Sequence, residues 1–342
     1  MPELRVDLDA IGRNTEVVAS LLRVHGLALV GVTKGCLGEP RVAAAMLAGG
    51  AAALADTRDR NLQRLRSAFP SAELHRIHLP SLSEPFDPGD VTYVTSREGA
   101  SAVAALGSAG GPRRVMIQVE TGDEREGVPG ELLLDLAGFV AEEPRLLLEG
   151  LSTNYACFLG PPAGLEASLE GVAHAARTLR SAGFPAGRVS GGNSSALWLL
   201  KRGGRLPEEV TELRCGEALL LGQDALFYEP VPGCLTDACV LRAEVLEEYT
   251  KSSSETSSEP AARGAARRVV LGIGRQDLSG GRVRFVDPGL VEVGRSADYL
   301  VAEVEAGSSA PAVGQVIEML PAYEALVAAW TSPYVEVRLR GL

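Results

Sequence analysis

The sequence predicts an α/β fold, a (β/α)8 TIM-type barrel followed by a mostly-β C-terminal domain. Short aliphatic or β-branched runs alternate with longer amphipathic or alanine-rich stretches up to about residue 228. After that residue, apolar and polar residues alternate between glycine turns, which indicates β-structure. Strands that alternate with helices pair in parallel, and eight such units in roughly 220 residues match the size of a (β/α)8 barrel. A doubly wound open sheet is the alternative that this spacing allows.

The barrel domain is expected over residues 8–228. Its eight predicted strands are short apolar runs at residues 28–34, 52–56, 74–80, 91–96, 114–120, 146–154, 188–194 and 212–217. Helical stretches lie between most of them, at residues 39–49, 57–68, 97–107, 131–142 and 164–182. One further helix, at residues 9–23, is expected before the first strand.

The C-terminal domain is expected over residues 229–342. Its predicted strands lie in the alternating segments 233–249, 267–274, 281–289, 296–306 and 334–341. A serine-rich stretch at residues 250–264 contains no core-forming side chains and predicts a flexible loop. Residues 1–7 are expected to pair with this domain.

Composition excludes several classes of protein. The net charge of −11 argues against nucleic-acid binding, because phosphate contacts need a basic surface. The five cysteines are scattered without a CxxC pair, so neither a disulfide framework nor a metal site is predicted, and a reducing cytosol fits. The first residues lack the apolar core of a signal peptide, and no apolar run is long enough to cross a membrane. We therefore expect a soluble cytoplasmic protein.

Lys34 stands at the end of the apolar run "ALVGVTK" (28–34), whereas Lys201 and Lys251 lie in polar stretches. Catalytic groups of a barrel gather where the strands end and the following loops begin. Partial burial of a lysine at such a position favours the neutral amine, which forms a Schiff base with an aldehyde. The alternative is a lysine whose stem lies along the barrel rim while its amine reaches solvent.

Two later strand ends carry an anion-binding pattern. The segment "SGGNSS" (190–195) combines small residues and hydroxyls ahead of a helix, which suits phosphate binding by backbone N–H groups. The segment "LRCGEALLLG" (213–222) places Arg214 and Gly216 at the end of the eighth strand, and phosphate sites after the seventh and eighth strands are common in barrels. A lysine and a phosphate site together are what pyridoxal 5′-phosphate (PLP) requires, since it carries an aldehyde and a phosphate.

These motifs resemble those of the alanine racemases and their relatives, the fold-type III PLP enzymes. The resemblance is carried, in order along the chain, by "VDLDAIGRN" (6–14), "VTKG" (32–35), "VETGDEREG" (119–127), "STNYA" (152–156), "GGNSSAL" (191–197), "LRCGEALLLG" (213–222), "VGRSAD" (293–298) and "YEALV" (323–327). Phrases such as "GVTKGCLG" (31–38) and "TSPYV" (331–335) are similar to the ornithine racemase subgroup.

The resemblance implies a PLP-dependent amino-acid racemase, which removes a proton from Cα and returns it on either face. Ornithine or another basic amino acid is the expected substrate, and alanine is the second choice. A homodimer is implied, with each active site shared between one subunit's barrel and its partner's C-terminal domain. The alternatives are a D-amino-acid aldolase or a decarboxylase of the same fold, and a PLP-binding homeostasis protein without catalytic activity.

The resemblance also implies roles for residues around the cofactor. Lys34 would hold PLP as a Schiff base and act as one of two bases. Ser194, with backbone N–H groups near Gly216 and Glu217, would bind the phosphate, and Tyr323 would lie near it.

Three more roles concern the cofactor ring and the substrate. Arg214 would face the pyridine nitrogen and disfavour its protonation, which restricts the chemistry to proton transfer at Cα and argues against a decarboxylase. Arg125 would lie near the cofactor O3′ and the substrate carboxylate, and Asn154 would lie against the ring. The lysine of the family pattern before "VDTG" is replaced here by Gln118.

The second base departs from the family pattern, because Ile273 stands where the racemases have a tyrosine. Asp277 is a candidate to accept the proton or to bind the distal amine of a diamino acid, and its alternative role is to cap a turn. Arg275 is a weaker candidate, because arginine is in general a poor base. Tyr299 and Tyr334 are further candidates.

Overall fold

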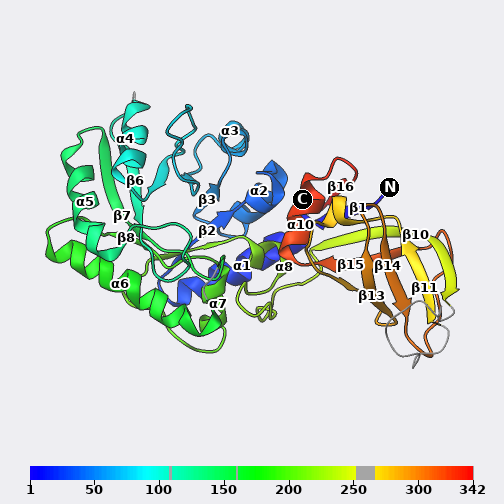
Figure 1. Ribbon diagram of the computed structural model, residues 1–342. Coiled ribbons are helices and arrows are strands. Elements are labelled where there is room, and N and C mark those ends of the chain that lie inside the picture. The colour runs from blue at the N-terminus through cyan, green and yellow to red at the C-terminus, as the bar shows by residue number, and fades with distance from the viewer. Residues whose placement is uncertain (108–109, 159–160, 252–265, 342) are drawn as a thin grey trace, which may run out of the picture. The chain divides into compact units, whose positions relative to one another are not determined.

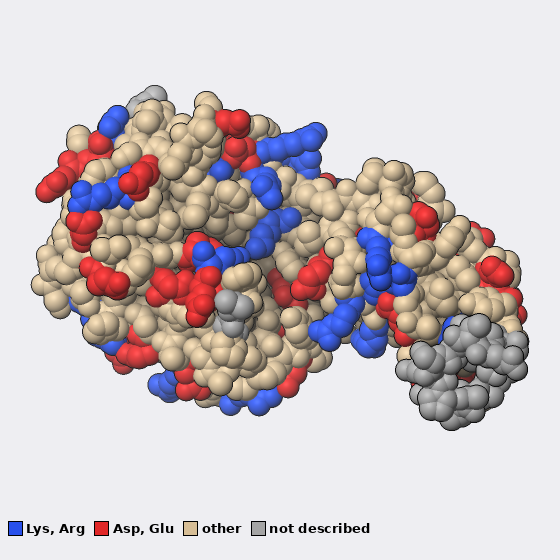
Figure 2. Space-filling view, in the orientation of Figure 1, with Lys and Arg blue, Asp and Glu red and all other residues tan. Residues whose placement is uncertain are grey.

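The protein is described by a computed structural model over residues 1–107, 110–158, 161–251 and 266–341 (Figure 1). The chain forms two compact units: Asp9–Leu235, called the barrel unit, and Met1–Leu8 with Thr236–Gly341, called the β unit. The loop predicted at 250–264 lies, from residue 252, outside the described residues. Figure 2 shows acidic and basic side chains intermixed over this face of each unit.

The barrel unit is built on a closed parallel barrel of eight strands. In order around it these are β2 (Ala28–Val32), β3 (Ala53–Asp56), β4 (Leu74–Arg76), β5 (Val91–Val94), β6 (Arg113–Gln118), β7 (Leu146–Ser152), β8 (Arg188–Ser190) and β9 (Glu212–Cys215). Because β9 pairs in parallel with β2, the sheet has no open edge. The predicted barrel is therefore confirmed, and the doubly wound alternative is wrong.

Helices alternate with these strands and lie outside them (Figure 1). They are α1 (Leu8–Val24), α2 (Pro40–Ala48), α3 (Asp59–Ala68), α4 (Arg97–Ala105), α5 (Leu133–Glu142), α6 (Leu165–Ser181), α7 (Leu197–Leu200) and α8 (Glu217–Leu221), with 3-10 turns η1 (Lys34–Cys36), η2 (Gly130–Leu132), η3 (Pro162–Gly164) and η4 (Ser194–Ala196). Local chemistry sets their starts: Pro40 occupies the first turn of α2, and the Ser96 hydroxyl accepts a hydrogen bond from Gly99 N at the start of α4. In the described part of the chain, no helix is both long and apolar enough to cross a membrane.

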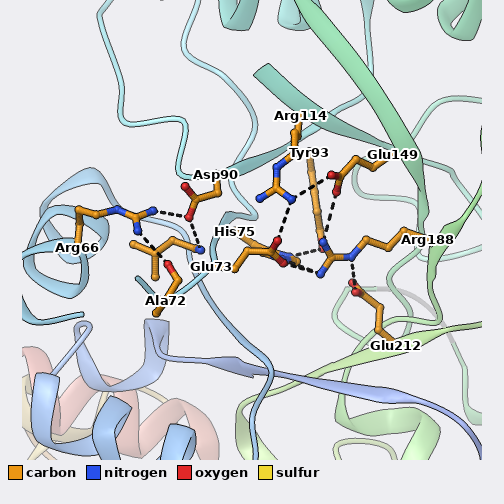
Figure 3. Close-up of polar contacts among 11 residues, drawn as sticks. Arg66, Ala72, Glu73, His75, Asp90, Tyr93, Arg114, Glu149, Arg188 and Glu212 are labelled. Carbon is orange, nitrogen blue, oxygen red and sulfur yellow. Dashed lines mark hydrogen bonds and ion pairs between the residues drawn. The ribbon is translucent and has the colours of Figure 1, made fainter. Parts of the chain in front are cut away.

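A charged network joins the N-terminal ends of the barrel strands (Figure 3). Arg188 Nε lies 2.7 Å from Glu212 Oε2 and its Nη2 lies 2.8 Å from Glu73 Oε1, while Arg114 Nη1 lies 2.9 Å from Glu73 and 3.0 Å from Glu149. Burial opposes the charge on Arg188, yet its pairs with Glu212 and Glu73 raise the pKa of Arg188 above its usual range. This face of a barrel contributes to stability, so we assign the network a structural role.

His75 and Tyr93 extend the network into the barrel interior (Figure 3). His75 Nε2 lies 2.8 Å from Glu73 Oε1, and this hydrogen bond is the main cause that holds the pKa of Glu73 far below its usual range. His75 Nδ1 lies 3.2 Å from the Tyr93 hydroxyl, whose pKa is raised by burial. The Tyr93 hydroxyl therefore stays protonated at neutral pH.

The β unit is built on an eight-stranded sheet. Its strands are β1 (Glu3–Asp7), β10 (Cys239–Lys251), β11 (Ala266–Leu271), β12 (Val283–Phe285), β13 (Leu290–Arg295), β14 (Leu300–Val304), β15 (Val316–Pro321) and β16 (Glu336–Arg340), and its helices are α9 (Arg275–Leu278) and α10 (Tyr323–Thr331). The sheet order is β12-β15-β10-β11-β14-β13, and β1 pairs antiparallel with β10 and parallel with β16. The sequence prediction missed the strands β13 and β15 and the helices α9 and α10.

Candidate active site

Lys34 follows the end of β2 and begins the 3-10 turn η1. Its side chain is half-buried, and its ammonium has neither a hydrogen bond nor an ion pair with any residue that the structure describes. Lys201 differs, because its Nζ lies 2.6 Å from the buried Asp224 and 3.1 Å from Glu229. Lys201 is therefore a structural lysine, whereas the amine of Lys34 is available for chemistry.

Asp56 anchors the backbone from which Lys34 extends. It is fully buried at the end of β3, and its Oδ2 accepts a 2.6 Å hydrogen bond from the hydroxyl of Thr33, the residue before Lys34. Its Oδ1 accepts from the backbone N–H groups of Thr57 and Arg58 at 2.7 and 3.1 Å and from Asn61 Nδ2 at 2.9 Å. The same carboxylate thus holds the start of α3 and the turn that carries Lys34.

The predicted phosphate-binding residues come together where β8 and β9 end. Ser194 is buried at the start of η4, and its Oγ accepts a 3.3 Å hydrogen bond from Ala218 N in the first turn of α8. Gly216 packs directly against β2, because a Cβ there would lie 3.0 Å from Val32 O and 3.1 Å from Val32 Cβ. Glu217 begins α8. The geometry therefore places this pair of loops beside the strand that leads to Lys34.

Arg214 is a buried cation that is held by neutral groups. It is 5% exposed, and its guanidinium donates to Ser152 Oγ, to Ser190 Oγ at 2.7 Å and to Thr153 O at 2.8 Å. It also lies over the Tyr93 ring, 4.9 Å from its centroid. No carboxylate of the described ranges forms an ion pair with it. The positive charge beside the ends of β7 and β8 therefore has no counter-ion among the residues that the structure describes.

Asn154 belongs to an amide and carboxylate cluster at the end of β7. Its Nδ2 donates to Asp123 Oδ2 at 3.1 Å, and its Oδ1 accepts from Asn193 Nδ2 at 3.1 Å. Asn193 directly precedes Ser194 and caps η4 through a 2.7 Å bond from Ser195 N. The cluster therefore connects the predicted ring contact with the predicted phosphate contact.

Arg125 lies on the loop after β6, with a side chain 37% exposed. It pairs with Glu126 through both Nε and Nη2, and its Nε lies 3.5 Å from Asp123 Oδ2. The sequence prediction found Arg125 but assigned no role to Asp123 or Glu126. The only signal for them was their place in the quoted motifs, and a motif does not tell which carboxylate contacts which cation.

Tyr323 and Asp277 lie in the β unit, beside a cavity of about 630 Å³ between α9 and α10. Tyr323 begins α10 and lines the cavity, together with Arg275 and Ser332. Asp277 is buried, and its Oδ1 accepts a 2.8 Å hydrogen bond from Ser332 Oγ while its Oδ2 accepts from Gly274 N at 3.2 Å. Its observed contacts are those of a capping residue. Across the described ranges, no three His, Cys, Asp or Glu side chains gather as a metal site would require.

Barrel enzymes carry their catalytic groups at the C-terminal ends of the strands. Lys34, Ser194 and Arg214 all follow or end such strands, so fold and site together define a (β/α)8-barrel enzyme. The family is narrower: the chain belongs to the family described as alanine racemase, N-terminal domain, whose model matches residues 6–224. The resemblance predicted from the motifs is confirmed.

Two curated relatives match nearly the whole chain. The chain is 29% identical over 350 residues to the lysine racemase of Thermotoga maritima, covering 98% of this chain and 97% of the relative. It is 27% identical over 355 residues to the ornithine racemase of Acetoanaerobium sticklandii, covering 99% of each. Both names agree with the predicted resemblance to the ornithine racemase subgroup.

Solved structures share the fold at low identity. D-threonine aldolase from Filomicrobium marinum matches with a TM-score of 0.76 and 20% identity over 96% of this chain and 89% of that one. Alanine racemase from Streptomyces lavendulae matches with a TM-score of 0.72 and 17% identity over 99% of this chain and 97% of that one. Since both an aldolase and a racemase share the fold, the fold alone does not select the reaction.

Proposed function

We propose that the protein is a PLP-dependent amino-acid racemase whose substrate is a basic amino acid, ornithine or lysine. The observation that carries the proposal is the half-buried amine of Lys34, which pairs with none of the described residues and follows the strand against which Gly216 packs. The two curated relatives support a basic substrate, and alanine is the second choice.

The residues present fit PLP, which carries an aldehyde, a phosphate and a pyridine nitrogen. The Lys34 amine is free to bind the aldehyde. The phosphate suits the buried Ser194 hydroxyl and the Gly216 backbone, which packs so closely on Val32 that a side chain would force a small shift. Arg214 lacks a carboxylate partner among the described residues, so its charge is available to the nitrogen. When bound, PLP supplies an electron sink that acidifies the Cα proton of the attached amino acid.

Each residue then has a defined task. Lys34 moves the proton at one face of Cα through its Nζ. Arg214 would disfavour protonation of the ring nitrogen, because two adjacent positive charges disfavour each other. Ser194 and the backbone near Gly216 and Glu217 would hold the phosphate, and Asn154 would contact the ring.

Three further tasks concern the substrate and the β unit. Arg125 would bind the substrate carboxylate, and Tyr323 is the candidate residue of the β unit for a contact with the cofactor phosphate. Asp277 is the candidate proton carrier for the second face of Cα, since the buried Ile273 cannot carry a proton. The protein is proposed to act as a homodimer with shared active sites.

Exchange of the α-proton in D2O tests the proposal. PLP-loaded protein is incubated with L- and D-ornithine, lysine, alanine, serine and D-threonine, with Lys34→Ala as the control. We expect deuterium at Cα and inversion for ornithine or lysine, and neither in the control. Release of glycine and acetaldehyde from D-threonine, or no exchange with any amino acid, would contradict the proposal.

A further inference from the structure

The guanidinium of Arg125 is held along one edge and open along the other. Its Nε and Nη2 pair side-on with the two carboxylate oxygens of Glu126, the Nη2 contact being 2.8 Å. Its Nη1 has no partner within the described ranges of the chain, and the side chain is 37% exposed. A guanidinium has five donors in a planar fork and can accept a second carboxylate on the edge formed by Nη1 and Nη2.

Glu126 is connected to the barrel interior through Gln118. Gln118 is 3% exposed at the end of β6, and its Nε2 lies 3.5 Å from Glu126 Oε1, at the long limit of a hydrogen bond. Its Oε1 accepts a 2.8 Å hydrogen bond from Ser152 Oγ, which in turn accepts from Arg214 Nη1. Each group in this series therefore donates to the next one, from Arg214 through Ser152 and Gln118 to Glu126.

This chain of contacts explains why glutamine suits position 118. The side chain must accept a hydrogen bond from the Ser152 hydroxyl and also donate one toward the Glu126 carboxylate. A glutamine amide offers both an acceptor and donors, whereas a lysine ammonium offers donors alone. The glutamine that stands at position 118 in place of the family's lysine is therefore suited to donate a hydrogen bond to the carboxylate of Glu126.

We propose that Glu126 is a positioning residue that orients Arg125, so that the free Nη1 and Nη2 edge binds the α-carboxylate of the amino-acid substrate. Gln118 fixes Glu126 in turn and links its position to that of Arg214. This inference rests on the proposed function. An arginine held in place before the substrate arrives has less side-chain freedom to lose when it binds a carboxylate.

Glu126→Gln tests this role, because it removes the charge and keeps the size of the side chain. Glu124→Gln is the matched control: it makes the same charge change two residues away, and the Glu124 side chain is exposed without a hydrogen bond or ion pair to any described residue. The probes are lysine and 1,5-diaminopentane, which has the same chain of carbons and amines but lacks the carboxylate. Their dissociation constants are measured from the absorbance change of the PLP-loaded, full-length protein.

We expect Glu126→Gln to weaken lysine binding about fivefold and to leave 1,5-diaminopentane binding unchanged. Glu124→Gln should change neither. Arg125→Lys should remove the preference for lysine over the diamine, and adding Glu126→Gln to it should cause no further loss, because Glu126 acts through Arg125.

Equal effects of Glu126→Gln and Glu124→Gln would overturn the positioning role, as would an equal loss of lysine and diamine binding. An additive loss in the double variant with Arg125→Lys would overturn it as well. The failure of the proposed function has a different signature: the wild-type protein would show no absorbance change with either probe, and the inference would fall with it.

Discussion

Replacement of Gly216 by alanine perturbs the junction between β9 and β2 by one methyl group. The new Cβ would lie 3.0 Å from Val32 O and 3.1 Å from Val32 Cβ, so the backbone there must move by a few tenths of an ångström. The φ of Gly216 is −128°, so the cost comes from the contact rather than from a left-handed backbone. Overpacking of this kind costs about 1–3 kcal/mol.

We expect two consequences of Gly216→Ala. The melting temperature of the apo-protein falls by several degrees, since each kcal/mol corresponds to roughly 2–4 °C for a unit of this size. PLP affinity falls about tenfold, because a 1.4 kcal/mol loss at the site is tenfold in the dissociation constant and Val32 leads directly to Lys34. Thermal unfolding followed by circular dichroism and equilibrium titration with PLP measure these two quantities.

Gly187→Ala is the matched control, because a Cβ at Gly187 would meet nothing within 4 Å. It should leave the PLP affinity unchanged. If Gly216→Ala and Gly187→Ala gave the same melting temperature and the same PLP affinity, the close packing of the β9 end on β2 would have no bearing on the site, and the reasoning would be refuted.

Three other predictions concern titratable residues. The folded-state pKa of Glu73 lies below its ordinary value near 4.5, so the stability that ionised Glu73 contributes is complete above that pH and is lost as the pH falls below it. The difference in melting temperature between the wild type and Glu73→Gln should therefore narrow from about pH 6 to about pH 3. A difference that stays constant over this range would contradict the prediction. Lys201→Ala should cost about 3–5 kcal/mol of stability, because it leaves the buried carboxylate of Asp224 without its cation. It should nevertheless retain the visible absorbance of bound PLP, which Lys34→Ala should lose. Loss of that absorbance in both variants would contradict the assignment of Lys34 as the residue that binds PLP. Asp277→Asn should slow inversion about a hundredfold while deuterium exchange with retention persists, and an equal slowing by Ser332→Ala would indicate a capping role alone.

The barrel was predictable because its signals are local. Buried parallel strands are short apolar runs, and apolar residues in the helices between them recur with the spacing of a helical turn. The strand ends were less predictable: the run 28–34 was expected to be one strand, but β2 stops at Val32 and Lys34 begins a 3-10 turn. Here the Thr33 hydroxyl bonds to Asp56, a contact between strands that the order of residues does not reveal.

The missed elements of the β unit have weak patterns. The register of β13 shifts between Glu292 and Gly294, which interrupts the alternation of apolar and polar residues. The helix α10, "YEALVAAWT", is almost entirely apolar and so lacks a polar face to reveal its period. The short runs of β15 and β13 therefore read as connecting segments.

The candidate site was predictable only in part. The motifs identified Lys34, Arg125, Ser194 and Arg214 by resemblance, and the structure places each of them after or at the end of a barrel strand. The pairing of Arg125 with Glu126 rather than with another acid of the same loop depends on side-chain directions, which only the folded chain defines.

The strand β1 pairs with strands that are synthesised much later than β1 itself. All strands of the barrel are made before residue 236, whereas β1, which leaves the ribosome first, pairs with β10 and with β16. During synthesis the barrel can close while β1 waits without a partner, and the sheet of the β unit is completed only when β16 emerges. Slow translation of the last hundred or so residues would therefore prolong the exposure of a single strand, a recognised hazard for aggregation and a natural place for a chaperone to act.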